Sequence, residues 1–267
     1  MNTTRVLSGL ALAPLLFVVV WLLSPAYFTV LVVIAAAIGQ YELYSMAKAR
    51  GTAPLTAAGI MLGALIVINF YRPLYPYAGG HLFWVTLCVL GVMVARLFSR
   101  RTVDGAFEDI AATVLGVFYV ALLFGFQVAI HAGPAGKKWL VFLYLVIWAS
   151  DTGAYYVGTA FGKRRLYEKI SPKKSIEGLA GGMAASVVVA LLCKWLLVPS
   201  AGLLEAAVLG AALAAVGTVG DLVESLIKRS AGVKDSGNLI PGHGGILDRM
   251  DSMLFAAPVL FYYLRMR

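Results

Sequence analysis

The stretch SLIKRSAGVKDSGNLIPGHGGILDRMDS, residues 225–252, separates two long apolar segments and holds the densest charge and glycine of the chain. Cations and carboxylates follow one another along it: Lys228, Arg229, Lys234, Asp235, Asp248, Arg249 and Asp251. Its cations could bind anions, its carboxylates could bind metal ions, and its glycines would let another backbone approach closely. The remaining sequence is predicted to be a membrane scaffold that holds this stretch at a bilayer surface.

The composition places the chain among integral membrane proteins. Of its 267 residues 61% are hydrophobic and 13% are charged, whereas soluble domains carry roughly 25% charged residues. We therefore predict an all-α, multi-pass protein with one integral domain, residues 1–267, made of N-terminal scaffold spans (about 1–135) and C-terminal spans (about 139–265) that carry the charged stretch. The net charge of +9 lies mainly in loops between apolar segments. This pattern favours membrane topology and anionic lipid headgroups over nucleic acid as its cause.

About nine apolar segments are long enough to be spans, since a spanning helix needs about 20 apolar residues. They are residues 6–23, 26–47, 55–71, 81–98, 110–131, 139–161, 176–197, 202–227 and 250–264. Sixteen of the 22 Lys and Arg residues fall on the side that holds the N-terminus and the stretch 225–252. The positive-inside rule makes that side cytoplasmic, so we expect a cell inner membrane protein whose polar cavity faces the cytoplasm.

Two carboxylates interrupt these apolar segments. Asp151 lies within segment 139–161, and Asp221 begins a polar stripe that continues at Glu224, Ser225 and Lys228 on one helix face. A charge in hydrocarbon is costly, so each should face a cavity or a partner. A structural ion pair is the alternative for Asp151, and an amphipathic helix end is the alternative for the stripe.

Three carboxylates are predicted to meet a cation. If a helix begins near Ile246, Asp248 and Asp251 share one face of its first turns, and Asp221 ends the preceding span. Oxygen ligands without a cysteine cluster favour Mg²⁺, which proteins commonly hold with one or two carboxylates and substrate phosphates. The alternative is a purely structural salt-bridge network with the neighbouring cations.

The glycine turn is the candidate phosphate site. Residues 241–245 can bend so that successive N–H groups converge, and the following helix start adds partial positive charge. His243 would donate to a phosphate or cap the turn, with Gly244 and Gly245 beside it. A glycine turn alone is weak support, but here cations flank it on both sides.

A second basic segment, residues 162–174, joins two spans on the same side. Ser171 followed by Pro172 is typical of a helix N-cap and first turn, which would aim Lys173 and Lys174 toward the surface. We expect Lys173, Lys174 and Ser175 to have a specific binding role. Topology or headgroup contact explains the other cations of this segment.

The stretch 225–252 resembles the signature of the phosphatidate cytidylyltransferase (CDP-diacylglycerol synthase) family. The matching positions are Ser225, Lys228-Arg229, Lys234-Asp235, Pro241-Gly242-His243-Gly244-Gly245 and Asp248-Arg249-Met250-Asp251. The segment SPKKS-IEG also resembles a family motif, with Ser175 where threonine is common. The resemblance covers the C-terminal half in motif detail and the N-terminal half only in general character.

This resemblance implies the reaction of CTP with phosphatidate to give CDP-diacylglycerol and pyrophosphate. It implies metal binding by Asp221, Asp248 and Asp251, and catalytic roles for these residues with Lys228 and His243. Substrate contacts would come from the remaining motif positions: Lys173, Lys174, Ser175, Ser225, Arg229, Lys234, Asp235, Gly244, Gly245 and Arg249. Asp151 would bind a second cation or organise the cavity.

Two other functions remain as alternatives. One is a CTP-dependent transferase acting on another lipid phosphate or a polyprenol. The other is a secondary transporter that uses Asp151 and Asp221 as an ion path, which leaves the glycine turn unexplained.

Small residues four apart, Gly178 with Gly182 and Gly181 with Ala185, indicate close helix packing within the chain, or alternatively a homodimer seam.

Overall fold

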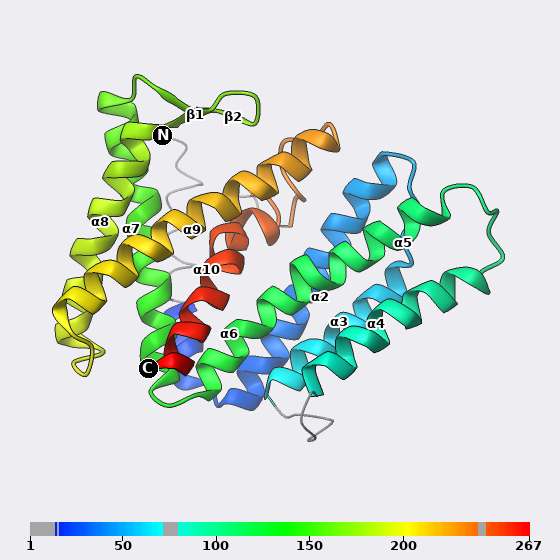
Figure 1. Cartoon of the computed structure of the whole chain (residues 1–267), viewed down its shortest axis with the longest axis horizontal. Coiled ribbons are helices and arrows are strands. Elements are labelled where there is room, and N and C mark those ends of the chain that lie inside the picture. The colour runs from blue at the N-terminus through cyan, green and yellow to red at the C-terminus, as the bar shows by residue number, and fades with distance from the viewer. Residues whose placement is uncertain (1–13, 15, 72–79, 240–243) are drawn as a thin grey trace. The chain divides into compact units, whose positions relative to one another are not determined.

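The computed structural model describes residues 14, 16–71, 80–239 and 244–267, and of residues 80 and 81 it describes the backbone alone. In the described part of the chain, two short strands follow the helix labelled α7 (Figure 1). The elements are α2 (Pro25–Ala49), α3 (Thr56–Tyr71), α4 (Gly80–Leu97), α5 (Ala106–Leu115), η1 (Gly116–Leu122), α6 (Leu123–Ala132), α7 (Gly136–Phe161), β1 (Arg165–Tyr167), β2 (Ser171–Ser175), α8 (Ile176–Leu196), α9 (Leu203–Ser230) and α10 (Leu247–Met266).

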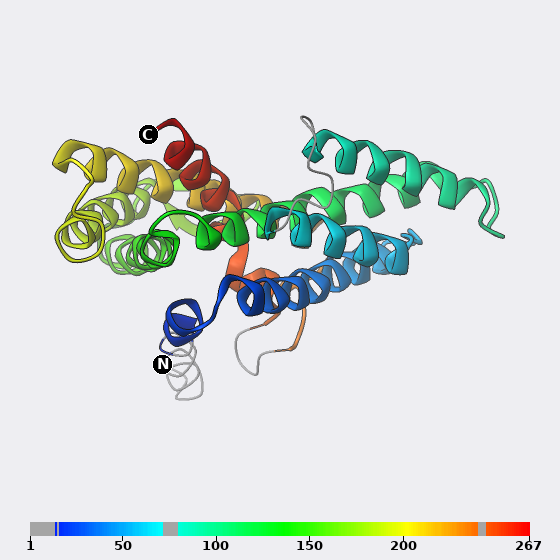
Figure 2. The same cartoon turned by 90° about the horizontal axis from the view of Figure 1, so that it is seen from below.

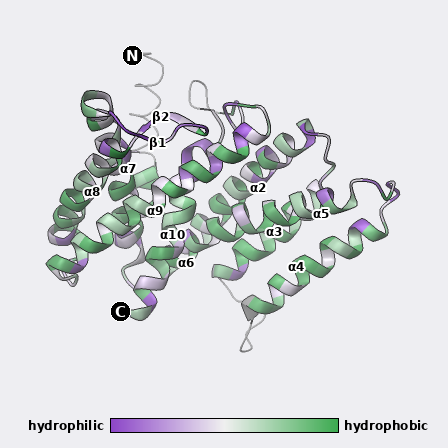
Figure 3. Ribbon diagram, turned by 45° about the horizontal axis from the view of Figure 1, so that its top comes forward, coloured by the Kyte–Doolittle hydropathy of each residue, from purple (hydrophilic) through white to green (hydrophobic). Residues whose placement is uncertain are grey.

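The chain divides into two compact units. Unit 1 comprises Met1–Ala132 and Ser230–Arg249, and unit 2 comprises Gly133–Arg229 and Met250–Arg267. The charged stretch 225–252 therefore contributes residues to both units. Within unit 2, hydrophilic residues gather in the β1–β2 segment, whereas α7 and α8 are mostly hydrophobic (Figure 3).

The prediction of a helical multi-pass membrane protein is confirmed. In the described part of the chain, five helical runs are long and apolar enough to cross a bilayer: Pro25–Ala49, Ala106–Ala132, Gly136–Phe161, Ile176–Leu196 and Leu203–Ser230. Helices α3, α4 and α10 coincide with three further predicted segments, 55–71, 81–98 and 250–264. Half of the first predicted segment, 6–23, lies outside the described residues, so the total of about nine spans stays a prediction.

One long helical run forms the middle of unit 1. The predicted segment 110–131 lies in the continuous run of α5, η1 and α6, in which η1 has the wider π-helical turn (Figures 1 and 2). The buried Tyr44 hydroxyl on α2 donates to the carbonyl oxygen of Thr113 at 2.9 Å. Gly116 permits this approach, because a Cβ there would lie 2.3 Å from the Tyr44 ring. These contacts fix α2 against the run at its π-helical turn.

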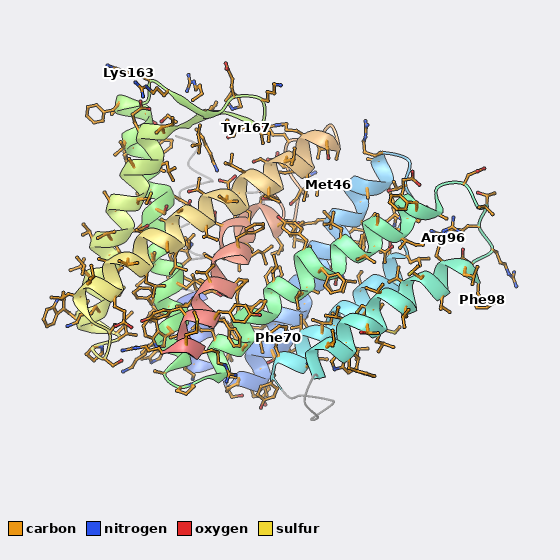
Figure 4. The ribbon with its side chains drawn as sticks, in the orientation of Figure 1. Met46, Phe70, Arg96, Phe98, Lys163 and Tyr167 are labelled. Atoms are coloured by element: carbon orange, nitrogen blue, oxygen red, sulfur yellow. The ribbon has the colours of Figure 1, made fainter. Side chains whose placement is uncertain are left out.

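Asp109 joins three segments of unit 1 at the start of this run. Its Oδ2 accepts from Arg96 Nε at 2.9 Å and its Oδ1 accepts from the Ala53 N–H at 2.6 Å. Arg96 also donates to the carbonyl oxygen of Thr102 at 2.7 Å, and it lies at the end of α4 in Figure 4. The pair therefore fixes the loop before α3 and the loop after α4. Because both charges are buried, the loss of either partner would be strongly destabilising.

Helices α7 and α8 of unit 2 pack with almost no side-chain bulk between them. A Cβ on Gly181 would lie 2.4 Å from Val157, and one on Gly182 would lie 2.8 Å from the carbonyl oxygen of Ser150. The predicted close packing of small residues is confirmed within one chain. A homodimer stays a prediction.

The segment between α7 and α8 corrects one expectation. Residues Ser171–Ser175 form strand β2, paired antiparallel with β1, so the prediction that a helix starts at Ser171 and Pro172 is wrong. The helix begins at Ile176 instead, because Ser175 is the N-cap and its hydroxyl oxygen accepts from the Gly178 N–H at 3.1 Å. The serine nearest the apolar run, rather than the serine before the proline, satisfies the first helical N–H groups.

Glu177 ties this hairpin to α8. Its carboxylate accepts from the backbone N–H groups of Lys163 at 3.1 Å and of Arg164 at 3.2 Å. The Ile176 N–H donates to the Arg164 carbonyl oxygen at 2.9 Å. Figure 4 labels Lys163 and Tyr167 in this segment. The hairpin is therefore anchored at the helix start rather than held by a core of its own.

Candidate active site

Asp221, on α9, is the centre of the polar side chains of unit 2. Its Oδ2 forms an ion pair with Nζ of Lys174, which comes from β2. Its Oδ1 accepts from the Ser225 hydroxyl, one turn further along α9, at 3.3 Å. The side chains of Asp221 and Lys174 are 29% and 26% exposed, so the pair stays in reach of solvent and of a soluble ligand.

Asp251 approaches Asp221 from α10. The two carboxylates repel each other, and Lys228 attracts Asp251. A glycine on α9 permits the approach, because a Cβ on Gly220 would lie 2.6 Å from the carbonyl oxygen of Asp251; a Cβ on Gly217 would instead lie 2.8 Å from Cδ1 of Ile147 on α7. Gly220 therefore leaves room for the α10 backbone beside α9, and Gly217 leaves room for a side chain of α7.

Glu224 and Lys228 are the buried members of the polar cluster around Asp221. Glu224 is 0% exposed and pairs with Lys228 Nζ at 3.4 Å, one turn along α9. Glu224 also lies beside Asp251. Lys228 therefore offsets part of a buried negative charge, which is a structural role in addition to the catalytic role predicted for it.

Asp248 belongs to unit 1 and organises the loop before α10. Its Oδ2 accepts from the Ser236 N–H at 2.8 Å, from the Ser236 hydroxyl at 2.9 Å and from the Gly245 N–H at 2.8 Å. Gly244 has a left-handed φ of 78°, and a Cβ there would lie 2.4 Å from Asp248 Oδ2. Glycine at 244 is thus required both for the backbone angle and for the space.

The remaining predicted site residues fall into three groups. Exposed side chains that could contact a ligand or headgroup are Lys173, Arg229, Lys234, Asp235 and Arg249. Ser175 is buried as the cap of α8. His243 lies outside the described residues, together with Pro241 and Gly242.

Asp151 lies in the middle of α7 and is exposed, as is Tyr155, one turn further on. The prediction that it faces a cavity stays a prediction. Among the residues that the structure describes, no three His, Cys, Asp or Glu side chains form a group able to hold a metal ion by themselves.

The comparison with known proteins extends over the entire sequence. The model of the cytidylyltransferase family matches residues 3–267. The chain belongs to this family. Among curated relatives of this cytidylyltransferase, a protein from Synechocystis sp. is 32% identical over 293 residues, covering 98% of this chain and 96% of its own length. Proteins from Bacillus subtilis (97% and 96%) and Haemophilus influenzae (97% and 97%) are also 32% identical. All three are named phosphatidate cytidylyltransferase.

The resemblance inferred from the motifs is therefore confirmed, but the motifs do not include Glu42. This buried carboxylate on α2 bonds to residues about 200 positions away, at the start of α10. A signal was present, since Glu42 lies inside the predicted apolar segment 26–47 as Asp151 lies inside 139–161. The rule that a charge in a span needs a partner applies equally to both residues.

Proposed function

We propose that this chain transfers the cytidylyl group of CTP to phosphatidate, giving CDP-diacylglycerol and pyrophosphate in phospholipid biosynthesis. The observation that carries this proposal is the similarity to phosphatidate cytidylyltransferases over 97–98% of the chain. The protein is thus a membrane nucleotidyltransferase. Its two substrates differ in kind, because CTP arrives from water and phosphatidate from the bilayer.

The reaction needs positioning and charge neutralisation more than covalent help. A phosphate oxygen of phosphatidate attacks the α-phosphorus of CTP, a new phosphorus–oxygen bond forms, and the bond to the bridging oxygen of the β-phosphate breaks. The departing pyrophosphate takes that oxygen and its electron pair. Phosphates carry both nucleophile and leaving group, so aligned cations supply most of the catalysis. Charge neutralisation by this chain would come from Lys174 and Lys228, which lie beside carboxylates of unit 2. The exposed Arg229 and Lys173 would also contact phosphate.

Asp221 and Asp251 fit Mg²⁺ by the chemistry of their donors. They are two mutually repelling carboxylates with a third, Glu224, beside them, an arrangement that a cation would relieve. Proteins commonly hold Mg²⁺ with one or two carboxylates and let substrate phosphates complete the shell. When bound, Mg²⁺ would supply positive charge to the triphosphate. Asp248 stays the third proposed ligand, and its Oδ2 also serves the loop before α10. Asp151 stays the candidate for a second cation.

The membrane setting follows from charge distribution. We place the N-terminus, the hairpin and the stretch 225–252 on the cytoplasmic side of the cell inner membrane, with about nine spans in total. The acyl chains of phosphatidate would then lie among the apolar helices while its headgroup meets the cations.

The test of the proposed function uses purified protein in mixed micelles with CTP and phosphatidate. We expect a CDP-lipid and pyrophosphate in equal amounts, and a loss of both when the divalent cation is chelated. An ion flux in proteoliposomes without CTP turnover would instead support the transporter alternative.

Lys174→Ala tests the ion pair between β2 and α9. Asp221 would lose its cationic partner, and we expect kcat/KM for CTP to fall by about tenfold to a hundredfold, as for other residues that orient a metal ligand. The matched control is Lys169→Ala, which removes an exposed cation from the turn of the same hairpin and should change kcat/KM less than twofold. If the two variants lowered kcat/KM equally, Lys174 would contribute only a general attraction of anions and no specific contact to Asp221.

A further inference from the structure

Glu42 caps a helix that lies far from it in sequence. It is 5% exposed on α2, and its Oε1 accepts from the Ile246 N–H at 2.9 Å while its Oε2 accepts from the Leu247 N–H at 3.0 Å. These N–H groups open α10. A carboxylate placed there satisfies two of the donors that a helix start leaves without partners, and it opposes the positive end of the helix dipole. Met46, labelled in Figure 4, lies one turn further along α2.

The local sequence of α10 explains why a distant carboxylate is needed. Ile246 immediately precedes the helix, and isoleucine has no side-chain oxygen with which to cap. Asp248, the nearest carboxylate, turns back to the Ser236 and Gly245 N–H groups instead. Glu42 therefore supplies the acceptor that the sequence around α10 does not.

The loop before α10 is shaped to close on this carboxylate. A Cβ on Gly245 would lie 2.4 Å from Glu42 Oε2, and a Cβ on Gly237 would lie 2.8 Å from Glu42 Oε1. Neither glycine has a positive φ, so their role here is to leave space. Two glycines of the stretch that resembles the family signature thus make room for Glu42.

Ser236 links Glu42 to Asp248. Its hydroxyl oxygen lies 3.0 Å from Glu42 Oε2 and 2.9 Å from Asp248 Oδ2. A hydroxyl has one proton to donate, so it bonds to one of the two carboxylates at a time and lies between them. Glu42 thus contacts the start of α10 directly and shares the Ser236 hydroxyl with Asp248, and Asp251 lies one turn further along α10.

We propose that Glu42 is a positioning residue for this enzyme: it fixes the start of α10 and, through Ser236, the direction of Asp248. The proposal rests on the proposed function, since Asp248 and Asp251 are there the carboxylates that face a cation. Glu42 itself touches neither substrate nor cation. Its effect is to set the geometry in which those carboxylates are presented.

Glu42→Gln is the first test. An amide offers one oxygen and one NH₂ where the carboxylate offers two oxygens, so one of the two N–H groups of α10 loses its acceptor. We expect amide exchange over residues 245–250 to become about five- to tenfold faster in the metal-free protein. We also expect the Mg²⁺ concentration for half-maximal CTP turnover to rise by about tenfold or more.

Ser236→Ala separates capping from positioning. It keeps both N–H bonds to Glu42 and removes only the hydroxyl link, so the Mg²⁺ requirement should rise while exchange at the start of α10 stays as in the wild type. Glu108→Gln, an exposed change on α5 of the same unit, is the control and should alter neither quantity.

Each outcome decides a separate point. A Glu42→Gln protein with wild-type exchange and Mg²⁺ requirement would overturn the proposal. A Ser236→Ala protein with a wild-type Mg²⁺ requirement would overturn the link from Glu42 to Asp248. If the Glu42→Gln protein does not fold, the Mg²⁺ requirement of the Ser236→Ala protein still tests whether Glu42 positions Asp248. If the wild type shows no CTP turnover, the proposed function fails, while the exchange experiment still tests the cap.

Discussion

Asp251→Asn should lower CTP-dependent formation of a CDP-lipid by at least about a hundredfold, the scale expected when an aligned electrostatic contact to reacting phosphates is lost. The stability of the protein should not fall with the activity. Asp251 is repelled by Asp221, so a neutral asparagine removes a strain from the folded state. We therefore expect an unchanged or higher Tm together with the loss of turnover, which is the signature of a residue retained for function rather than for folding.

The comparison for Asp251→Asn is Lys48→Ala, an exposed change at the end of α2 that should leave turnover and Tm unaltered. Asp221→Asn should behave as Asp251→Asn does if both carboxylates face one cation. Wild-type turnover of the Asp251 variant would remove that carboxylate from the metal site and leave it a structural role.

Asp109→Ala should destabilise unit 1 by about 3–5 kcal/mol, because it leaves the buried Arg96 guanidinium without its carboxylate. The side chains of Arg96 and Asp109 are 6% and 5% exposed, so water cannot replace the lost partner. The Ala53 N–H would lose its acceptor as well. The change in the free energy of unfolding can be measured by denaturant titration in detergent.

Asp104→Ala provides the control for this measurement. Asp104 is exposed in the loop between α4 and α5, and surface changes of this kind usually alter stability by less than about 0.5 kcal/mol. A similar, small effect of both substitutions would show that the Arg96–Asp109 pair contributes no more than an exposed ion pair does.

The helices could be predicted from the sequence because their signal is local. Segment 176–197 was expected and α8 runs Ile176–Leu196; the spacing of Gly178 and Gly182 likewise predicted close helix packing, which the structure shows against α7. The hairpin could not be predicted in this way, because Ser171-Pro172 and Ser175 both suit a helix start. Only the pairing of β1 with β2 and the bonds to Glu177 decide between them.

The proximity of Asp221 to Asp251 was predicted, because the two carboxylates lie at the ends of consecutive apolar segments, and their electrostatic interaction confirms it. The metal and substrate roles of these residues stay predictions, and the contacts between distant positions were missed. The ion pair of Lys174 with Asp221 and the cap that Glu42 gives α10 join residues 47 to 205 positions apart, which no local pattern encodes. The charge of Glu42 inside an apolar segment was the available signal.

The central claim is that the cytidylyl group itself passes to phosphatidate, and labelled CTP tests it most directly. Purified protein is given phosphatidate with CTP labelled at the α-phosphate in one reaction and at the γ-phosphate in another. We predict that the α-label enters the lipid product and the γ-label leaves as pyrophosphate. Transfer of the γ-label to lipid, with release of CDP, would identify a lipid kinase and contradict the account.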